Sequence, residues 1–184
     1  MKATEQLRNE HEGIKLMMRI LEKLSEKLEA GDDVDAEHLE KIVEFFRIFA
    51  DRCHHGKEED ILFPAMEAAG IPKKGGPIGV MLLEHDQGRG YVKGMADATA
   101  KYKAGDRKAA PVIASNARNY IALLTQHIEK ENRVLFPMAD SHLSAEKQES
   151  IFEAFEKIEV EKIGVGKHEE FHHLLDNLSA VYLK

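Results

Sequence analysis

Two short segments of this chain place a histidine and a glutamate four residues apart. They are HHGKEEDILFP at 54–64 and HIEKENRVLFP at 127–137, and their His, Lys, Glu and Leu-Phe-Pro coincide without a gap at an offset of 73 residues. Residues four apart lie on one face of an α-helix, so His54 with Glu58, and His127 with Glu131, each direct an imidazole and a carboxylate the same way. Such pairs are typical ligands of transition metals.

A second repeated motif supplies two more histidines. NEHEG at 9–13 and LEHDQG at 83–88 share a Glu-His-acid triplet at an offset of 74 residues, with His11 and His85 at its centre. The motifs at 9–13 and 54–64 are therefore repeated, in the same order, at 83–88 and 127–137. A repeat of this length predicts two helical hairpins related by a pseudo-twofold axis.

The stretches that carry these motifs have apolar residues at three- and four-residue spacing, which is typical of amphipathic helices. We expect helices over about 4–30, 35–70, 78–104 and 107–139, with a bend at Pro64. Two shorter helices are expected after Ser144, on the outside of the bundle. The sequence thus predicts an all-α protein of one domain over 1–184: an up-down-up-down four-helix bundle (about 4–140) with additional C-terminal helices (about 144–183).

Equal helix arms on either side of each turn bring the four histidines to one level, roughly 30 Å from the turns. Burying four imidazoles and two carboxylates without a metal would be costly, so this layer predicts a pair of first-row transition ions. The donor set favours iron, with manganese and zinc as alternatives. One turn away we expect a small or apolar lining, which suits a diatomic molecule better than an organic substrate. Its predicted residues are Ile14, Met18, Ala50, Gly88, Val92 and Leu124.

Other polar residues have two interpretations each. His168 and His172, four apart near the C-terminus, supply a fifth imidazole if the last helix folds against the bundle, or belong to a solvated helix end. Glu12 and Asp86 stand next to predicted ligands and are candidates to orient imidazoles. Tyr91 and Tyr120 are either donors near the site or structural tyrosines. The single cysteine cannot form an internal disulfide.

Composition excludes several classes of partner. The formal net charge is -7, and lysines alternate with glutamates, which argues against a nucleic-acid or anionic-membrane partner. No apolar run approaches the roughly 18 residues that span a bilayer, and the N-terminus lacks the apolar core of a signal peptide. We therefore expect a cytoplasmic protein.

Together, NEHEG, LLEHD and the two Leu-Phe-Pro segments closely resemble the hemerythrin-like (HHE) cation-binding domain, over about residues 4–140. The resemblance implies a di-iron centre with an oxo or hydroxo bridge. It makes Glu58 and Glu131 the bridging carboxylates, and the terminal ligands His11, His54, His85 and His127. Oxygen-carrying hemerythrins have a further histidine where this chain has Arg89. The ligand set is more similar to the bacterial branch associated with iron-sulfur repair and with nitric oxide or peroxide stress, although the cysteine-bearing N-terminal domain of the repair proteins is missing here.

Two functions follow. The first is a non-haem di-iron protein that binds or reacts with dioxygen, nitric oxide or peroxide, in oxygen handling or in defence against oxidative or nitrosative stress. Whether it turns over peroxide or nitric oxide as an enzyme stays open. The alternative is an iron or oxygen sensor without turnover, which signals to a protein partner; a bundle with an incidental zinc is the weakest interpretation. The sequence does not choose among the small ligands or fix the oligomeric state.

Overall fold

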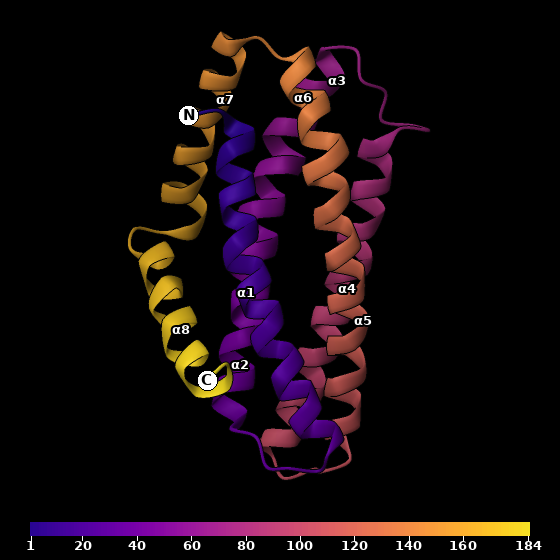
Figure 1. Ribbon diagram of the computed structural model, residues 1–184, viewed down its shortest axis with the longest axis vertical. Coiled ribbons are helices and arrows are strands. Elements are labelled where there is room, and N and C mark those ends of the chain that lie inside the picture. Colours follow the sequence, from indigo (N-terminus) through magenta and orange to yellow (C-terminus); the bar gives the residue numbers. More distant parts are fainter.

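A computed structural model describes residues 1–184, and it confirms the predicted all-α fold. Four long helical rods lie side by side and run alternately up and down, with two more helices along one flank (Figure 1). The first rod is α1 (Ala3–Glu29) and the third is α4 (Pro77–Lys103). No helix in the chain combines the length and the apolar character needed to cross a membrane.

The second and fourth rods are composite. The second joins α2 (Ala36–Phe45), the π-helical segments η1 (Phe46–His55) and η2 (Glu58–Leu62), and α3 (Phe63–Ala68). The fourth joins α5 (Ala109–Lys130), the π-helical η3 (Glu131–Leu135) and α6 (Phe136–His142). The repeat of the sequence is therefore also a repeat of backbone structure.

Each Leu-Phe-Pro sequence explains one π-helical turn. Proline has no N–H, and its ring clashes with the carbonyl four residues earlier. The helix responds by widening: the N–H of Phe63 bonds to the carbonyl of Glu58, five residues back, and the N–H of Phe136 bonds in the same way to Glu131. The irregularity expected at Pro64 is thus a π-helical turn that begins at a glutamate of the motif.

The rods turn back where the sequence stops favouring helix. The first rod ends at Gly31 and the third at Gly105, with φ of 79° and 101°, values that glycine adopts without the penalty of a side chain. The second rod starts at Asp35, whose carboxylate accepts the N–H of Glu37 over 2.9 Å. These ends set the lengths of the arms that bring the motifs to one level.

Apolar side chains form two separate clusters within the bundle. The larger contains 29 buried residues, among them Ile14, Phe46 and Leu124. The smaller contains 14, including Phe63 and Phe136 from the repeated motifs. The buried histidines and glutamates lie in neither cluster, and they form a polar layer of their own.

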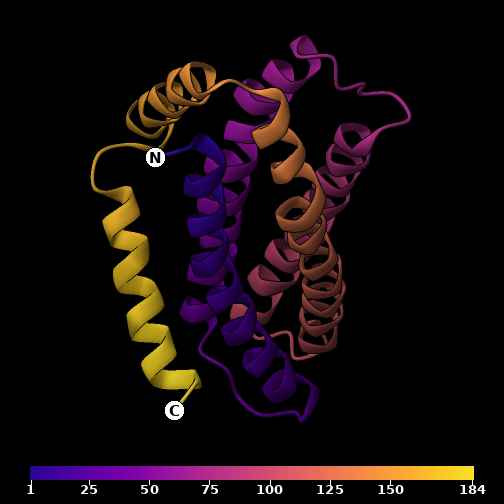
Figure 2. The ribbon, with the colours of Figure 1, turned by 45° about the horizontal axis from the view of Figure 1, so that its top comes forward.

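The C-terminal helices α7 (Ala145–Ile158) and α8 (Lys167–Tyr182), joined through η4 (Glu159–Ile163), pack outside the bundle as predicted. Both lie against α1, and η4 contacts η1 of the second rod. Figures 1 and 2 both show them covering one side of the bundle and leaving α4 and α5 uncovered.

Candidate metal centre

The six residues predicted as ligands meet in one buried layer, and each is at most 1% exposed. Together with His55, which was not predicted, they form two groups, and within each group the potential ligand atoms lie within 4.8 Å of one another. One group holds His11, His54, Glu58 and Glu131; the other holds His55, Glu58, His85 and His127. Glu58 belongs to both groups, so the layer has two adjoining centres instead of one.

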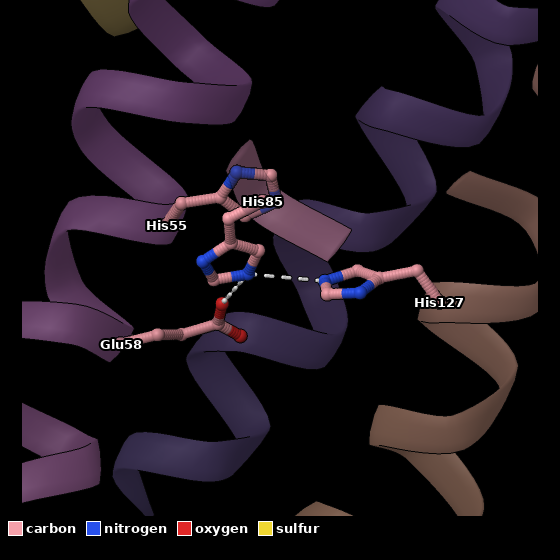
Figure 3. A group of neighbouring side chains, drawn as sticks. All are labelled: His55, Glu58, His85 and His127. Carbon is pink, nitrogen blue, oxygen red and sulfur yellow. Dashed lines mark hydrogen bonds and ion pairs between the residues drawn. The ribbon is translucent and has the colours of Figure 1, made fainter. Parts of the chain in front are cut away.

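Glu58 directs its two oxygens to opposite halves of the layer. Its Oε1 lies 3.5 Å from Nε2 of His54, and its Oε2 lies 3.2 Å from Nε2 of His85. The second contact is visible in Figure 3, where His85 lies between Glu58 and His127. A carboxylate placed in this way can bind one ion with each oxygen.

Glu131 repeats the arrangement from the fourth rod. Its Oε2 lies 3.0 Å from Nε2 of His11, and its Oε1 lies 2.9 Å from Nε2 of His127. Each half of the layer therefore offers two imidazole nitrogens and one oxygen from each of two carboxylates. The two halves thus repeat each other's donor atoms, as the repeat in the sequence predicts.

The outward nitrogen of each of the four predicted ligand histidines donates to an oxygen on a neighbouring helix. The pairs are His11 with Asn132 (2.9 Å), His54 with Glu10 (2.7 Å), His85 with Glu59 (3.0 Å) and His127 with Glu84 (2.7 Å). Because these oxygens accept, Nδ1 of each ring carries a proton, and Nε2 is the nitrogen that faces the layer and can bind a metal once it is free of a proton. Such partners fix the ring orientation of metal-binding histidines.

Cations stand behind these carboxylates. Lys57 binds Glu10, and Lys130 binds Glu84, at equivalent positions of the two halves. Arg89 binds Glu59. Each carboxylate around the layer is thus paired with a cation. This pairing favours the ionised form, which accepts a hydrogen bond from the imidazole.

The buried glutamates and histidines of the layer influence one another's protonation. Burial and the neighbouring Glu131 act to raise the pKa of Glu58, but His54 and His85 outweigh both and hold it below its usual value. Burial favours neutral imidazoles, yet the adjacent glutamates raise the pKa of His54 and of His127 to about 10. In the metal-free protein both rings are therefore imidazolium ions at neutral pH, with a second proton on Nε2, and a bound metal must displace that proton.

The donor atoms fit a pair of cations. Nε2 of His54, both oxygens of Glu58 and Oε1 of Glu131 are buried without a hydrogen-bond partner. Nε2 of His85 and Nε2 of His127 face each other at 3.1 Å, and two lone pairs at that distance need a cation or a proton between them. Buried acceptors left unpaired are costly, so the layer is built to hold positive charge.

Phenylalanines from the two repeated motifs cover the layer on one side. The ring of Phe136 stacks on His11 at 5.5 Å between centroids, and the ring of Phe63 stacks on His85 at 6.0 Å. Both phenylalanines are at most 1% exposed. This agrees with the expectation that the Leu-Phe-Pro segments pack and close the end of the site.

The acids predicted to orient the imidazoles were the wrong neighbours. Glu12 and Asp86, which follow His11 and His85 in sequence, are exposed and pair with surface cations. The orienting carboxylates are on the other side of each histidine, at Glu10 and Glu84. Each reaches across to a histidine of the next rod, which sequence adjacency does not reveal.

The C-terminal histidines do not reach the layer. His172 is exposed, and His168 lies 3.5 Å from the sulfur of Cys53. One potential ligand atom of His168 lies within 4.8 Å of those of Glu10, Cys53 and Glu159. The ammonium group of Lys57 binds both carboxylates of this cluster, and the imidazole of His54 also binds Glu10, so both carboxylates already have cationic partners.

The fifth imidazole beside the layer is His55, which the sequence did not single out. Its ring lies nearly parallel to that of His85, at 15° and 3.8 Å between centroids (Figure 3), and its Nδ1 donates to Asp51 over 3.2 Å. A metal ion lies in the plane of the imidazole that binds it, so two stacked parallel rings do not share an ion. In this arrangement His55 covers His85 without completing its ligand set.

A cavity of about 340 Å³ adjoins His55 and His85. It is lined by Arg47, Asp51, His55, His85, Gly88, Arg89, Val92, Lys93 and Tyr120. Of the six residues predicted to line a pocket beside the ligands, only Gly88 and Val92 line this cavity. The other four are buried in the large apolar cluster, to which Val92 also belongs. The charged and polar side chains of this lining could orient a larger ligand, so the cavity does not select for diatomic molecules alone.

Arg89 occupies the helix position where oxygen-carrying hemerythrins have a histidine, but it serves the site indirectly. Its Nε donates to Asp51 over 2.9 Å, and its guanidinium also binds Glu59. Asp51 holds His55, and Glu59 holds His85. One guanidinium thus organises both stacked imidazoles.

Comparison with known proteins agrees with this geometry. Residues 2–139 match the hemerythrin HHE cation-binding domain. Among curated relatives, uncharacterized proteins of Mycobacterium bovis and of two strains of Mycobacterium tuberculosis are 29% identical to the chain over 162 residues. The aligned segment covers 88% of this chain and 63% of each relative, so the chain spans less than two thirds of their length. Because this domain match covers well over half of the chain, the chain belongs to the hemerythrin HHE cation-binding family, whose domain binds metal ions.

Proposed function

We propose that this protein holds two iron ions and binds or reacts with a small oxidant. His11 and His54 would bind one ion, His85 and His127 would bind the other, and Glu58 and Glu131 would bridge them. The observation that carries this proposal is the placement of each glutamate, with one oxygen toward each pair of histidines.

Iron is favoured over the alternatives by the donor set. Each half of the layer offers two imidazoles and two carboxylate oxygens, which suit iron, and no thiolate, since Cys53 lies outside the layer. Four donors satisfy zinc in a closed structural site, whereas iron with the same donors keeps positions for an exogenous molecule. Manganese would be distinguished by metal analysis.

When bound, an iron pair supplies two electrons reversibly, one from each ion, together with positions for dioxygen, nitric oxide or peroxide. The chain's own residues do the rest. Glu10, Glu59 and Glu84 keep three of the imidazoles oriented, and Phe63 and Phe136 keep water away from one side of the layer. This arrangement supports a role in oxygen handling or in defence against oxidative or nitrosative stress.

The experiment is to reduce iron-loaded protein anaerobically and add successive portions of hydrogen peroxide. Repeated oxygen release with recovery of the reduced state would identify an enzyme. Separate samples of the reduced protein receive dioxygen or nitric oxide, and one stable adduct there, with no turnover of peroxide, would identify a carrier or sensor. A Glu58→Ala, Glu131→Ala double variant is the control, and it should lose the iron and every response.

A sensor remains the second candidate because one chain of contacts leaves the layer toward the C-terminal helices. His54 donates to Glu10, Glu10 binds Lys57, and Lys57 binds Glu159 in η4. A change of charge at the layer would alter this chain and the docking of η4. Limited proteolysis of α7 and α8 in reduced, oxidised and metal-free protein tests this, and equal cleavage in all three states would exclude it.

A further inference from the structure

The two halves of the bundle differ most at the cavity beside His85. The repeat equates residues 74 apart in the first and third rods and 73 apart in the second and fourth, so each wall residue of the cavity has a counterpart, and at three positions a small or polar wall residue has a larger apolar one. Gly88 corresponds to Ile14, Asp51 to Leu124 and His55 to Ile128. The three counterparts are 1–3% exposed and belong to the large apolar cluster. One half is therefore filled where the other is hollow.

Gly88 keeps the hollow half open. A Cβ at position 88 would lie 3.2 Å from Cε2 of Tyr120, which is closer than ordinary contact. At Gly90, one half-turn further along α4, a Cβ would meet nothing within 4 Å. The two glycines of one helix therefore provide a variant that fills the cavity and a matched variant that does not.

Three cations, Arg47, Arg89 and Lys93, and one carboxylate, Asp51, line the cavity of a protein whose net charge is -7. The guanidinium of Arg89 is occupied by carboxylates, and Lys93 pairs only with exposed Asp97, over 3.0 Å. Arg47 lines the cavity and two adjoining hollows and makes no ion pair. Unpaired cations at a concave surface attract anions and raise their local concentration.

We propose that this cavity is a binding site for small anions, with Arg47 as its principal attracting charge. A water molecule takes about 30 Å³ of liquid, so 340 Å³ accommodates an anion the size of azide, formate or a small carboxylate with its hydration. If the layer holds the proposed metal pair, exogenous ligands reach it from this side, beside His85, and not from the side closed by Ile14; this inference rests on the proposed function.

The test uses azide and nitric oxide as probes, one charged and one neutral. Iron content is measured first for every variant, and azide binding is then followed by calorimetry and by the visible spectrum. Arg47→Gln should raise the Kd for azide by about five-fold or more at low ionic strength, with less effect at high salt, and should leave nitric oxide binding unchanged. Arg19→Gln, which removes an equal exposed charge at the position equivalent to Lys93, is the matched control.

Access is tested with the glycines. Gly88→Val, or Gly88→Ala if the valine variant does not fold, should slow the binding of both probes, whereas Gly90→Ala should bind them as the wild type does. Equal effects of the two arginine variants would overturn the anion site, and unchanged binding in iron-loaded Gly88 variants would overturn the route. If the wild type holds no iron pair, the proposed function fails; calorimetry of azide with metal-free wild-type and Arg47→Gln protein then still decides the anion site.

Discussion

Lys57 and Lys130 offer a test of how burial changes the contribution of a lysine–glutamate ion pair to the free energy of unfolding. They occupy equivalent positions of the repeat, and each binds a glutamate that orients a histidine of the layer. Their surroundings differ: the side chain of Lys57 is 0% exposed beneath the C-terminal helices, whereas that of Lys130 is 42% exposed. Replacing each with methionine removes the charge and keeps a flexible apolar side chain.

The expected losses of stability differ several-fold. Lys57→Met leaves Glu10 and Glu159, with side chains 7% and 22% exposed, without their cation. Removing one partner of a buried pair costs roughly 3–5 kcal/mol, and the partial exposure of Glu159 favours the lower end, about 3 kcal/mol. Lys130→Met breaks a pair that water reaches, so about 0–1 kcal/mol is expected.

The assay is urea unfolding of metal-free wild type and both variants, with midpoints and slopes compared. Thermal unfolding of the same proteins checks this: a difference of about 2–3 kcal/mol, at roughly 2–4 °C per kcal/mol for a chain of this size, separates the melting temperatures of the variants by about 4–12 °C. Losses of equal size, or a larger loss for Lys130→Met, would refute the reasoning that the C-terminal helices turn this contact into a buried one. A changed slope would indicate that α7 and α8 unfold separately.

Three further outcomes are expected. In the metal-free protein, the pKa values of His54 and His127 are raised to about 10, so protonation of these rings stabilises the fold fully below about pH 6.5 and this stabilisation is lost as the pH rises toward 10. Metal affinity should instead increase with pH, because a bound metal displaces these protons. Unfolding and metal titrations in buffers from pH 6 to 10 check both. Phe136→Ala should lower the free energy of unfolding by roughly 3–5 kcal/mol, because its buried ring packs on His11. The control Val134→Ala, at a half-exposed position, should lower it by less than about 0.5 kcal/mol. Equal unfolding midpoints of the two variants would contradict the packing of Phe136 on His11. Removing metal with a chelator should lower the melting temperature by about 8 °C or more if free metal exceeds its Kd about a thousand-fold, and an unchanged melting curve would mean that the layer holds none.

The fold and the layer could be predicted because the repeat constrains them jointly. Two motifs with a common offset fix which helix faces point inward, and the turns at Gly31 and Gly105 fix their level. Residues that break the repeat were missed. His55 corresponds to Ile128, so comparison of the halves gave no reason to single it out.

The lining of the cavity could not be predicted for a different reason. Counting turns from His54 placed Ala50 at the site. The cavity adjoins His55 instead, and Asp51 and Arg47 lie four and eight residues before His55, on the same face of the helix. The contacts that orient the imidazoles depend on the spacing between rods, which no pattern within one helix records.

The most direct test of a bridged metal pair is the iron content of the oxidised wild type, combined with its Mössbauer and electron paramagnetic resonance spectra. The placement of Glu58 and Glu131 predicts two irons per chain that are magnetically coupled and therefore silent in electron paramagnetic resonance. One iron per chain, or two irons with the signals of isolated ferric ions, would contradict a centre bridged by these carboxylates.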